Sequence, residues 1–207
     1  MKQDCQSCKK PFEATPCVLF DIAARCPKCR LAYAARYATL GWNKDKWTAT
    51  ELNSGVPNGF LVLAPGAQTA GAERAVEQAL GEQCGLHLVG DSGKGKTLTL
   101  AVLAKRLIRF GVPVAFINTP QFSAWLRCNP DRQEEQRLRL TNVRHLILDD
   151  MGAEYDKTGW WGAWLLAVAD ARYGAHRATS SSCNSVTGIE TRVLRRVTEF
   201  ALTVELQ

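Results

Sequence analysis

The 207-residue sequence lacks long apolar runs. No segment approaches the ~20 consecutive apolar residues that a membrane-spanning helix needs. The first ten residues, MKQDCQSCKK, also lack the apolar core of a secretory signal peptide. We therefore expect a cytoplasmic protein with no membrane partner. The hydrophobic fraction is nonetheless 46%, which is typical of a globular protein with a sizeable core and excludes a disordered chain.

An excess of acidic residues is also missing, since 26 Lys and Arg residues outnumber 20 Asp and Glu residues. The net charge is +6 and the isoelectric point is near 9.0. Residues 1–47 carry nine basic and four acidic residues, so most of the basic excess lies near the N-terminus. A basic surface attracts polyanions, and this bias favours contact with nucleic acid, although basic solvated faces are common.

Eight cysteines are present, and in a chain without signs of secretion paired cysteines are more often metal ligands than disulfides. Cys5 and Cys8 form one Cys-x2-Cys pair, and Cys26 and Cys29 form another after 17 intervening residues. This spacing is typical of a structural zinc site, in which four thiolates complete a closed tetrahedron around the metal. We predict that these four cysteines bind Zn²⁺, which would stabilise a segment too small to fold alone.

The other cysteines are interpreted without a metal. Cys17 lies between the two pairs and could replace one ligand, but it lacks a Cys-x2-Cys partner, so a bystander role is favoured. Cys84, Cys128 and Cys183 are scattered along the chain, and we expect them to be small buried side chains.

The composition divides the chain into two modules and a connecting segment. Residues 31–42, LAYAARYATLGW, have apolar positions three and four apart, which predicts a helix completing a zinc-binding module over residues 1–47. Residues 48–69 are rich in Gly, Pro, Asn and Thr and are interpreted as a linker and entry segment. Residues 70–207 then form the main domain.

Strand and helix patterns alternate in the main domain. A helix is predicted over residues 97–110, ended by Gly111 and Pro113. Short apolar segments predict strands at residues 85–90, 114–118, 145–150 and 200–206, and the more polar segment 178–184 is a possible further strand. The alternation predicts an α/β fold, a parallel sheet with helices on both faces. The segment 178–184 is the least typical strand, because three serines are unusual in a buried strand.

A phosphate-binding loop follows the first predicted strand. Its sequence is GDSGKGKT, formed by Gly90, Asp91, Ser92, Gly93, Lys94, Gly95, Lys96 and Thr97. The spacing G-x4-G-K-[ST] between a strand and a helix is typical of nucleotide-binding proteins, because the glycines let backbone N–H groups turn toward phosphate oxygens. Lys96 would contact the β- and γ-phosphates, and the Thr97 hydroxyl would ligate Mg²⁺.

Two acids end the third predicted strand. Asp149 and Asp150 follow the apolar residues Leu146, Ile147 and Leu148, at the strand end that faces the ligand crevice of α/β sheets. Asp149 would hold Mg²⁺ and Asp150 would orient the attacking water. A pair of solvated acids is the alternative, but two adjacent acids downstream of the phosphate-binding loop favour nucleotide hydrolysis.

The stretch from residue 145 to residue 185, HLILDDMGAEYDKTGWWGAWLLAVADARYGAHRATSSSCNS, resembles the central part of the DnaC-type helicase loaders and their IstB-like relatives, which are AAA+ ATPases. The segment TRVLRRV at residues 191–197 resembles the family's next element, and the likeness covers residues 55–207. The resemblance implies ATP as the nucleotide and an AAA+ core with a five-stranded parallel sheet. It also implies that the helical lid found at the C-terminus of many AAA+ proteins is missing.

Three further roles are implied by the resemblance. Asn184 would be the sensor-1 residue, which reads the γ-phosphate through the attacking water. Arg196 would be the arginine finger, acting on the nucleotide of a neighbouring subunit, with Arg192 and Arg195 as close alternatives. Asp150, Asn184 and Arg196 are thus the predicted catalytic residues. The chain would self-associate through the finger, and a lone subunit would hydrolyse ATP slowly.

Several conspicuous side chains have simpler interpretations. Trp160, Trp161 and Trp164 lie at helical spacing and are predicted to pack in the core, in preference to stacking on bases. His87 and His145 lie in strands and are predicted to be core or edge residues. A basic segment before the two acids could contact single-stranded DNA, or could form a helix ion-paired with Glu134 and Glu135; it contains Arg132, Arg137, Arg139 and Arg144.

The favoured function is an ATP-dependent loader of a replicative helicase onto single-stranded DNA. The zinc module would hold a DnaB-type helicase, and ATP hydrolysis would time release. An IstB-like ATPase that assists a DNA transposase shares the same motifs and is the alternative within the fold. A non-catalytic zinc adaptor that binds nucleotide is the alternative from another class.

Overall fold

The computed structural model describes residues 2–4, 11–13, 69–110 and 112–206. Near the N-terminus, β1 (Lys2–Asp4) pairs antiparallel with β2 (Pro11–Glu13). The four predicted zinc ligands and Cys17 lie outside the described residues, as do the predicted helix 31–42 and nearly all of the linker. The zinc site and the domain boundaries therefore stay predictions.

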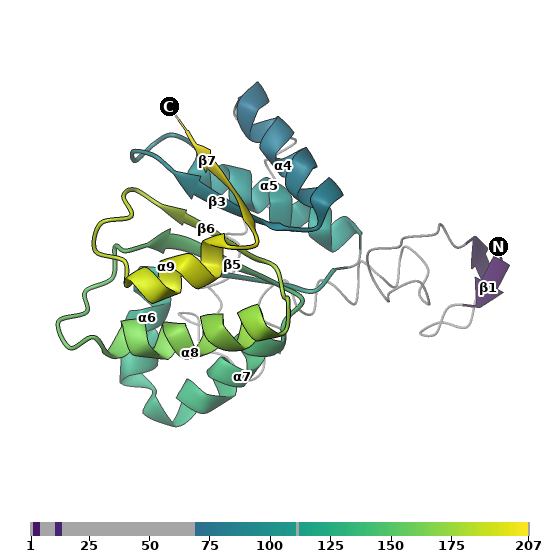
Figure 1. Ribbon diagram of the computed structural model, residues 1–207. Helices are drawn as coiled ribbons and strands as arrows, with labels where there is room; N and C mark the ends of the chain where they lie inside the picture. The colour runs from purple at the N-terminus through teal and green to yellow at the C-terminus, as the bar shows by residue number, and fades with distance from the viewer. Residues whose placement is uncertain (1, 5–10, 14–68, 111, 207) are drawn as a thin grey trace.

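A five-stranded parallel sheet forms the centre of the main domain (Figure 1). Its strands are β3 (Gly85–Val89), β4 (Val114–Asn118), β5 (His145–Met151), β6 (Thr179–Cys183) and β7 (Ala201–Glu205). The spatial order is β4-β5-β6-β3-β7, and every neighbouring pair is parallel. All five predicted strands are confirmed, with ends that differ by at most one residue.

Helices cover both faces of this sheet, as predicted (Figure 1). One face packs against α4 (Ala70–Glu82) and α5 (Lys96–Arg109). The other packs against α6 (Thr119–Cys128), α7 (Gln133–Asn142), α8 (Trp160–Gly174) and α9 (Thr191–Thr198), with the short 3-10 helix η2 (Pro130–Arg132) between α6 and α7. Successive side chains of a strand point to opposite faces, so Ala115 and Ile117 enter one core while Val114 and Phe116 enter the other.

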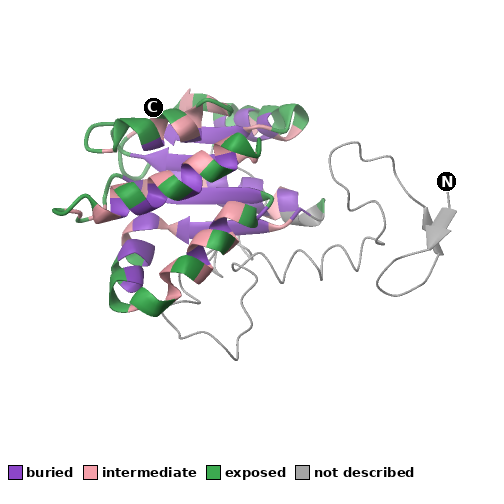
Figure 2. Cartoon of the chain, turned by 60° about the horizontal axis from the view of Figure 1, so that its bottom comes forward, coloured by how far each residue is buried: buried purple, intermediate pink, exposed green. Residues whose placement is uncertain are grey.

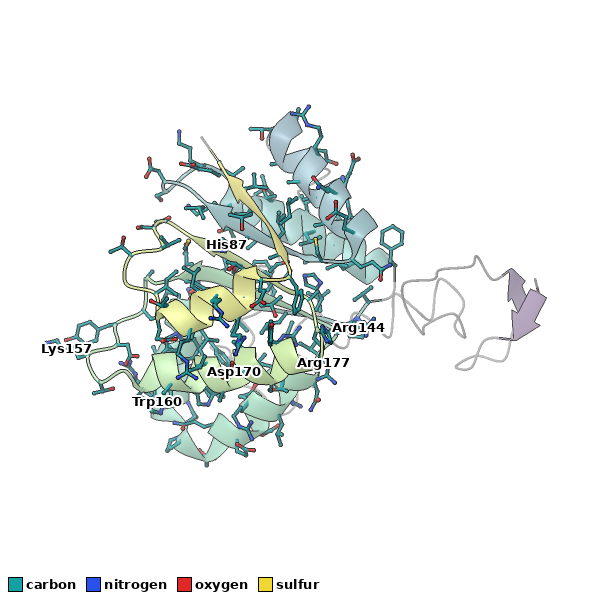
Figure 3. All side chains as sticks on the ribbon, in the orientation of Figure 1. His87, Arg144, Lys157, Trp160, Asp170 and Arg177 are labelled. Carbon is teal, nitrogen blue, oxygen red and sulfur yellow. The ribbon has the colours of Figure 1, made fainter. Side chains whose placement is uncertain are left out.

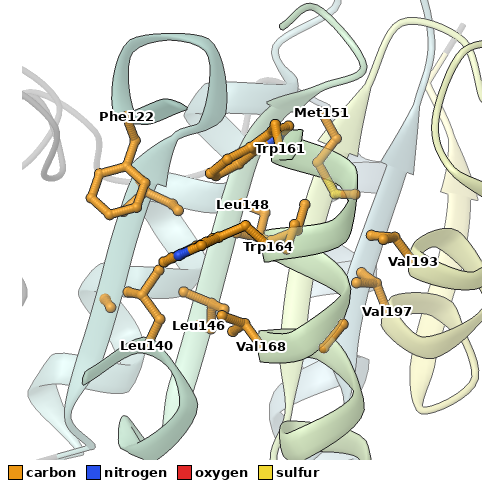
Figure 4. Packing of buried hydrophobic residues seen from close by; sticks show 14 of the residues in the cluster. Phe122, Leu140, Leu146, Leu148, Met151, Trp161, Trp164, Val168, Val193 and Val197 are labelled. Carbon is orange, nitrogen blue, oxygen red and sulfur yellow. The ribbon is translucent and has the colours of Figure 1, made fainter. Parts of the chain in front are cut away.

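Aromatic side chains fill the core beneath α6 and α8 (Figure 4). Trp161 and Trp164 stack with ring centroids 5.4 Å apart, and both rings pack near Phe122. Their predicted packing role is confirmed. Trp160 is only half-buried, and the Arg127 guanidinium lies over its ring. Figure 2 shows the same pattern across the domain, with buried strands and exposed outer surfaces on the helices.

The three serines of β6 are fully buried, and each is hydrogen-bonded. Ser180 Oγ lies 2.8 Å from His145 Nε2 and accepts a hydrogen bond from the Leu86 N–H. Ser181 Oγ lies 2.7 Å from His87 Nδ1. Buried hydroxyls are tolerated when partners replace water, so the unusual composition of β6 reflects these contacts. The prediction that both histidines are core residues is confirmed, since their residues are 1% and 4% exposed.

The described cysteines differ in exposure. Cys183 is buried and Cys84 is half-buried, but Cys128 is exposed, so its predicted burial is wrong. Cys128 ends α6 on the side opposite the buried Phe122 and Leu126. Within the described part of the chain, no helix has the length and apolarity needed to span a membrane.

Candidate nucleotide-binding site

The predicted site residues gather at the carboxyl edge of the sheet. The phosphate-binding loop follows β3, the two acids lie near the end of β5, and Asn184 follows β6. Because the strands are parallel, their carboxyl ends lie along one edge, where α/β proteins bind ligands. The sheet therefore brings together residues that are far apart in the sequence.

The loop itself depends on its glycines. Gly90, Gly93 and Gly95 have positive φ angles of 152°, 85° and 79°, which residues with a side chain rarely adopt. A Cβ atom on Gly90 would also lie only 2.4 Å from the Leu206 carbonyl oxygen. Residues 91–94 of the loop are exposed, so its backbone is accessible from solvent.

Lys96 begins α5 and is 6% exposed. Its Nζ donates hydrogen bonds to the carbonyl oxygens of Gly90 and Asp91, at 2.7 and 2.8 Å, and to Asn184 Oδ1 at 2.8 Å. All three acceptors are uncharged oxygens. These bonds orient the ammonium group over the loop and leave its positive charge available to a phosphate.

Asp149 lies behind this loop and is 3% exposed. The Thr97 hydroxyl lies 3.1 and 3.0 Å from its two carboxylate oxygens, and Ser182 Oγ donates to Oδ1 at 2.6 Å. Burial raises the pKa of Asp149, an effect opposed by the Ser182 and Thr97 hydrogen bonds and by Lys96. A hydroxyl and a carboxylate held side by side are hard oxygen donors, so the pair fits Mg²⁺.

Asp150 has a different environment from its neighbour. Its φ angle is 61°, a left-handed conformation uncommon for a non-glycine residue. The carboxylate is half-buried and lies 3.5 Å from Asn118 Nδ2, on the last residue of β4. Asn118 and Ser182 were not among the predicted site residues. The signals available were a polar residue ending the apolar strand VAFIN and the serines of β6.

Solved structures with this arrangement of elements include the DnaI structure, with a TM-score of 0.63 and 21% identity over 73% of this chain and 94% of that one. A putative primosome component from Streptococcus pyogenes serotype M3 has a TM-score of 0.55 and 28% identity over 68% of this chain and 81% of that one. The DnaC helicase loader has a TM-score of 0.57 and 18% identity over 68% of this chain and 93% of that one. The main domain therefore shares its fold with the DnaI structure and with the DnaC helicase loader.

The fold is also similar to that of DnaA from Aquifex aeolicus bound to AMPPCP, with a TM-score of 0.58 and 18% identity over 66% of this chain and 45% of that one. No protein-family model matches the chain, and no curated protein sequence matches it. The relationship is therefore visible in the arrangement of strands and helices.

The main domain carries three arginines on α9, and they differ in environment. Arg196 Nε donates to Asp170 Oδ1 on α8 at 2.7 Å, and its guanidinium stacks over the Tyr173 ring at 4.2 Å. Figure 3 shows Asp170 on the α8 side of this contact. The side chains of Arg192 and Arg195 are 71% and 72% exposed, compared with 27% for Arg196. The geometry thus favours the two exposed arginines for reaching a neighbouring chain.

The basic segment of the main domain forms an ion-paired surface on η2 and α7. Arg132 pairs with Glu135 at 2.7 Å, and Arg137 pairs with Glu134 at 2.6 Å. Arg139 approaches Glu135 at 3.6 Å. The interpretation of this segment as an ion-paired helix is confirmed.

Proposed function

We propose that the chain is an ATP-dependent loader of a replicative helicase onto single-stranded DNA. The observation that carries this proposal is the joint arrangement of Lys96 with Asn184 and of Thr97 with Asp149 within a loader fold. A fold alone supports many functions, whereas this pairing provides both a phosphate-binding cation and a metal-binding carboxylate.

The chain's own residues divide the work of hydrolysis. The loop N–H groups and Lys96 bind the phosphates, while Thr97 and Asp149 hold Mg²⁺, which when bound neutralises charge on the phosphate oxygens. Asp150 orients and polarises the attacking water, because its carboxylate can accept a proton from that water. The amide of Asn184 then contacts the same water and the γ-phosphate.

The nucleotide can act as a timing signal because Lys96 has only three donors. In this structure all three are used, by Gly90, Asp91 and Asn184. A phosphate that accepts one of these hydrogen bonds would compete with Asn184 for the Lys96 ammonium group. Release of Asn184 would then favour a different position of the segment from residue 184 to α9. That segment leads to the exposed Arg192 and Arg195, which would supply the arginine finger to a neighbouring chain.

Contacts with the partners are assigned to separate parts of the chain. The N-terminal module, with Zn²⁺ bound by Cys5, Cys8, Cys26 and Cys29, would hold the DnaB-type helicase. The ATPase domain would assemble on single-stranded DNA, and the basic excess of the chain, most of which lies in residues 1–47, favours contact with such a polyanion. ATP hydrolysis would then end the contact with the helicase.

The test is affinity capture from the native cell with Asp150→Asn protein loaded with ATP, compared with Lys96→Ala protein. Asp150→Asn should keep nucleotide binding and lose hydrolysis, whereas Lys96→Ala should lose both. A replicative helicase captured only by Asp150→Asn, and lost after zinc chelation or Cys26→Ser, supports the loader. A transposase in its place indicates the IstB-like function, and DNA without either partner overturns the proposal.

Hydrolysis itself distinguishes the adaptor alternative. Phosphate release by the purified full chain should be slow and should increase with the helicase and single-stranded DNA. It should fall by about a hundredfold or more in Asp150→Asn, since general-base assistance contributes typically 10²–10⁴-fold. Tight nucleotide binding with no hydrolysis under any of these conditions would indicate a nucleotide-binding adaptor.

A further inference from the structure

The pairing of β5 with β6 contains a bulge at the two acids. Leu148 lies opposite Ser181, and Met151 lies opposite Cys183. Between these pairs β5 has two residues, Asp149 and Asp150, where β6 has only Ser182. A bulge of this kind changes the direction in which side chains point, and bulges are common beside active sites.

Ser182 binds both residues of the bulge through a single hydroxyl. Its Oγ accepts a hydrogen bond from the Asp150 N–H at 3.0 Å and donates to Asp149 Oδ1 at 2.6 Å. The direction of both bonds is determined, because a backbone N–H can only donate and the hydroxyl has one hydrogen to give. Ser182 is fully buried, so water does not compete for these contacts.

A second hydroxyl holds the other side of the bulge. Thr119 Oγ1 lies 3.1 Å from the Asp149 carbonyl oxygen and 3.0 Å from the Asp150 carbonyl oxygen. Thr119 therefore contacts only the backbone of the two acids, whereas Ser182 also contacts the Asp149 carboxylate. Ser182 is thus the residue through which the bulge and the carboxylate are oriented together.

The other serines of β6 do not share this position. The hydroxyls of Ser180 and Ser181 are hydrogen-bonded to the buried side chains of His145 and His87, and neither hydroxyl contacts the two acids. They provide a matched comparison on the same strand, with equal burial and the same side chain.

We propose that Ser182 is a positioning residue for the hydrolytic site. It orients the Asp149 carboxylate toward Thr97, where the two would hold Mg²⁺. It also holds the bulge, so that the side chains of Asp149 and Asp150 point in different directions. This inference rests on the proposed ATPase function. Two hydroxyls contact the Asp149 carboxylate: Thr97 Oγ1 lies near both of its oxygens, and Ser182 Oγ donates to Oδ1. Loss of Ser182 therefore removes the shortest of these contacts. Outer partners of metal-binding carboxylates commonly affect metal affinity in this way.

The test uses the full chain, with Ser182→Ala compared with Ser181→Ala. Binding of a fluorescent AMPPCP derivative is measured over a range of Mg²⁺ concentrations, so the readout does not require hydrolysis. For Ser182→Ala we expect the Mg²⁺ concentration at half-maximal effect to rise about tenfold or more, while binding without Mg²⁺ changes less than about twofold. Ser181→Ala should keep the wild-type Mg²⁺ requirement.

Turnover provides a second readout. In Ser182→Ala, kcat at saturating Mg²⁺ should fall about tenfold with KM for ATP nearly unchanged, because the bulge at Asp150 loses its N–H partner. Ser182→Thr, which keeps the hydroxyl, should recover most of the loss. Ser182→Cys, which has nearly the same volume but a weak donor, should not, and it replaces the alanine variant if that protein does not fold.

The possible results separate this inference from the function on which it rests. Equal Mg²⁺ requirement and equal kcat in Ser182→Ala and Ser181→Ala would overturn the role of Ser182 and leave the ATPase intact. Nucleotide binding without wild-type hydrolysis would remove the enzymatic proposal, while the Mg²⁺ titration would still decide the role of Ser182. Absence of nucleotide binding in the wild-type chain would overturn both.

Discussion

Lys96 donates a 2.8 Å hydrogen bond to Asn184, although 88 positions separate them in the sequence. The two residues follow neighbouring parallel strands, β3 and β6, so the sheet order places them together. The contact joins the predicted phosphate-binding cation directly to the predicted sensor residue. It therefore offers a physical route from nucleotide binding to the segment that leads to α9.

Substitution of Lys96 and substitution of Asn184 should affect different steps, nucleotide binding and nucleotide hydrolysis respectively. Lys96→Ala should weaken nucleotide binding by about a hundredfold or more, because a nearly buried cation opposite phosphates contributes a charge-assisted contact. Asn184→Ala should bind nucleotide within about threefold of wild type but hydrolyse it tenfold to a hundredfold more slowly, as for other donors that act in the transition state. Fluorescent-nucleotide titration and phosphate release measure the two effects. Equal loss of binding in both variants would contradict these separate roles.

The α9 arginines should separate into structural and intermolecular groups. Arg196→Ala should lower the free energy of unfolding more than either neighbouring variant, because it removes the Asp170 ion pair and the stacking on Tyr173 at a partly exposed site. Arg192→Ala and Arg195→Ala should change it by less than about 0.5 kcal/mol. Urea denaturation measures these differences.

Turnover in mixed assemblies identifies the arginine that acts between chains. The double variant Arg192→Ala/Arg195→Ala should lose about a hundredfold or more of its ATPase rate, since an arginine finger contributes 10³–10⁵ in kcat. Adding Lys96→Ala chains, which keep the arginines but bind no nucleotide, should restore part of the rate. If instead Arg196→Ala loses the ATPase rate and Lys96→Ala chains restore it, Arg196 acts between chains, and its ion pair with Asp170 opens on assembly.

Arg172 should be a stability determinant of the main domain. It is 1% exposed, and its guanidinium donates to the carbonyl oxygens of Leu140, Val143 and Ala178 at 2.6–2.7 Å. Arg172→Met should reduce the free energy of unfolding by about 3–5 kcal/mol, because these buried acceptors would lose their donors.

A matched variant tests whether burial is the cause. Arg177 also donates to a backbone carbonyl, that of Thr141, but it is half-buried and lies near solvent. Arg177→Ala should therefore cost only about 1 kcal/mol, since water can replace the lost contact. Thermal or urea unfolding compares the two variants, and similar losses would contradict the special role of Arg172.

His145 should make the fold sensitive to acid. Burial, together with the nearby Arg172, lowers the pKa of His145 from 6.5 to about 3 in the folded chain. Between these values the unfolded chain binds a proton that the folded chain does not, so stability is full above pH 6.5 and falls as pH decreases. Burial lowers the pKa of His87 as well, with the same sign.

The free energy of unfolding should decrease, because of His145, by at most about 1.4 kcal/mol for each pH unit below pH 6.5. Urea denaturation of the wild type and of His145→Gln at pH 7.5, 6.0 and 5.0 measures it. The variant should show a smaller decrease between pH 6.0 and 5.0, and both proteins should show no histidine-dependent slope above pH 7. Parallel pH profiles would show that another group is responsible.

Much of the fold could be predicted from local patterns. Three strands are encoded by short apolar segments bounded by turn residues, at 85–90, 114–118 and 145–150. Their conformation follows from the local sequence alone. The phosphate-binding loop was equally evident, because its function depends on backbone angles that glycine allows at fixed spacing. In contrast, α4 was not predicted as a helix. Its buried residues are Ala72, Ala75, Val76 and Ala79, and the three alanines differ little in hydrophobicity from their surroundings, although the helix packs on β3 and α5.

The sequence by itself determined the strands, the nucleotide-binding loop and the two acids, because each is encoded within a few consecutive residues. The tertiary structure alone decided that Ser182 binds both acids, that Asn118 lies beside Asp150, and that Arg196 is held by Asp170. It also decided that Cys128 is exposed. These relationships join segments distant in the chain, and they depend on strand order, on a one-residue bulge and on which helix packs on which face, none of which is encoded in local spacing.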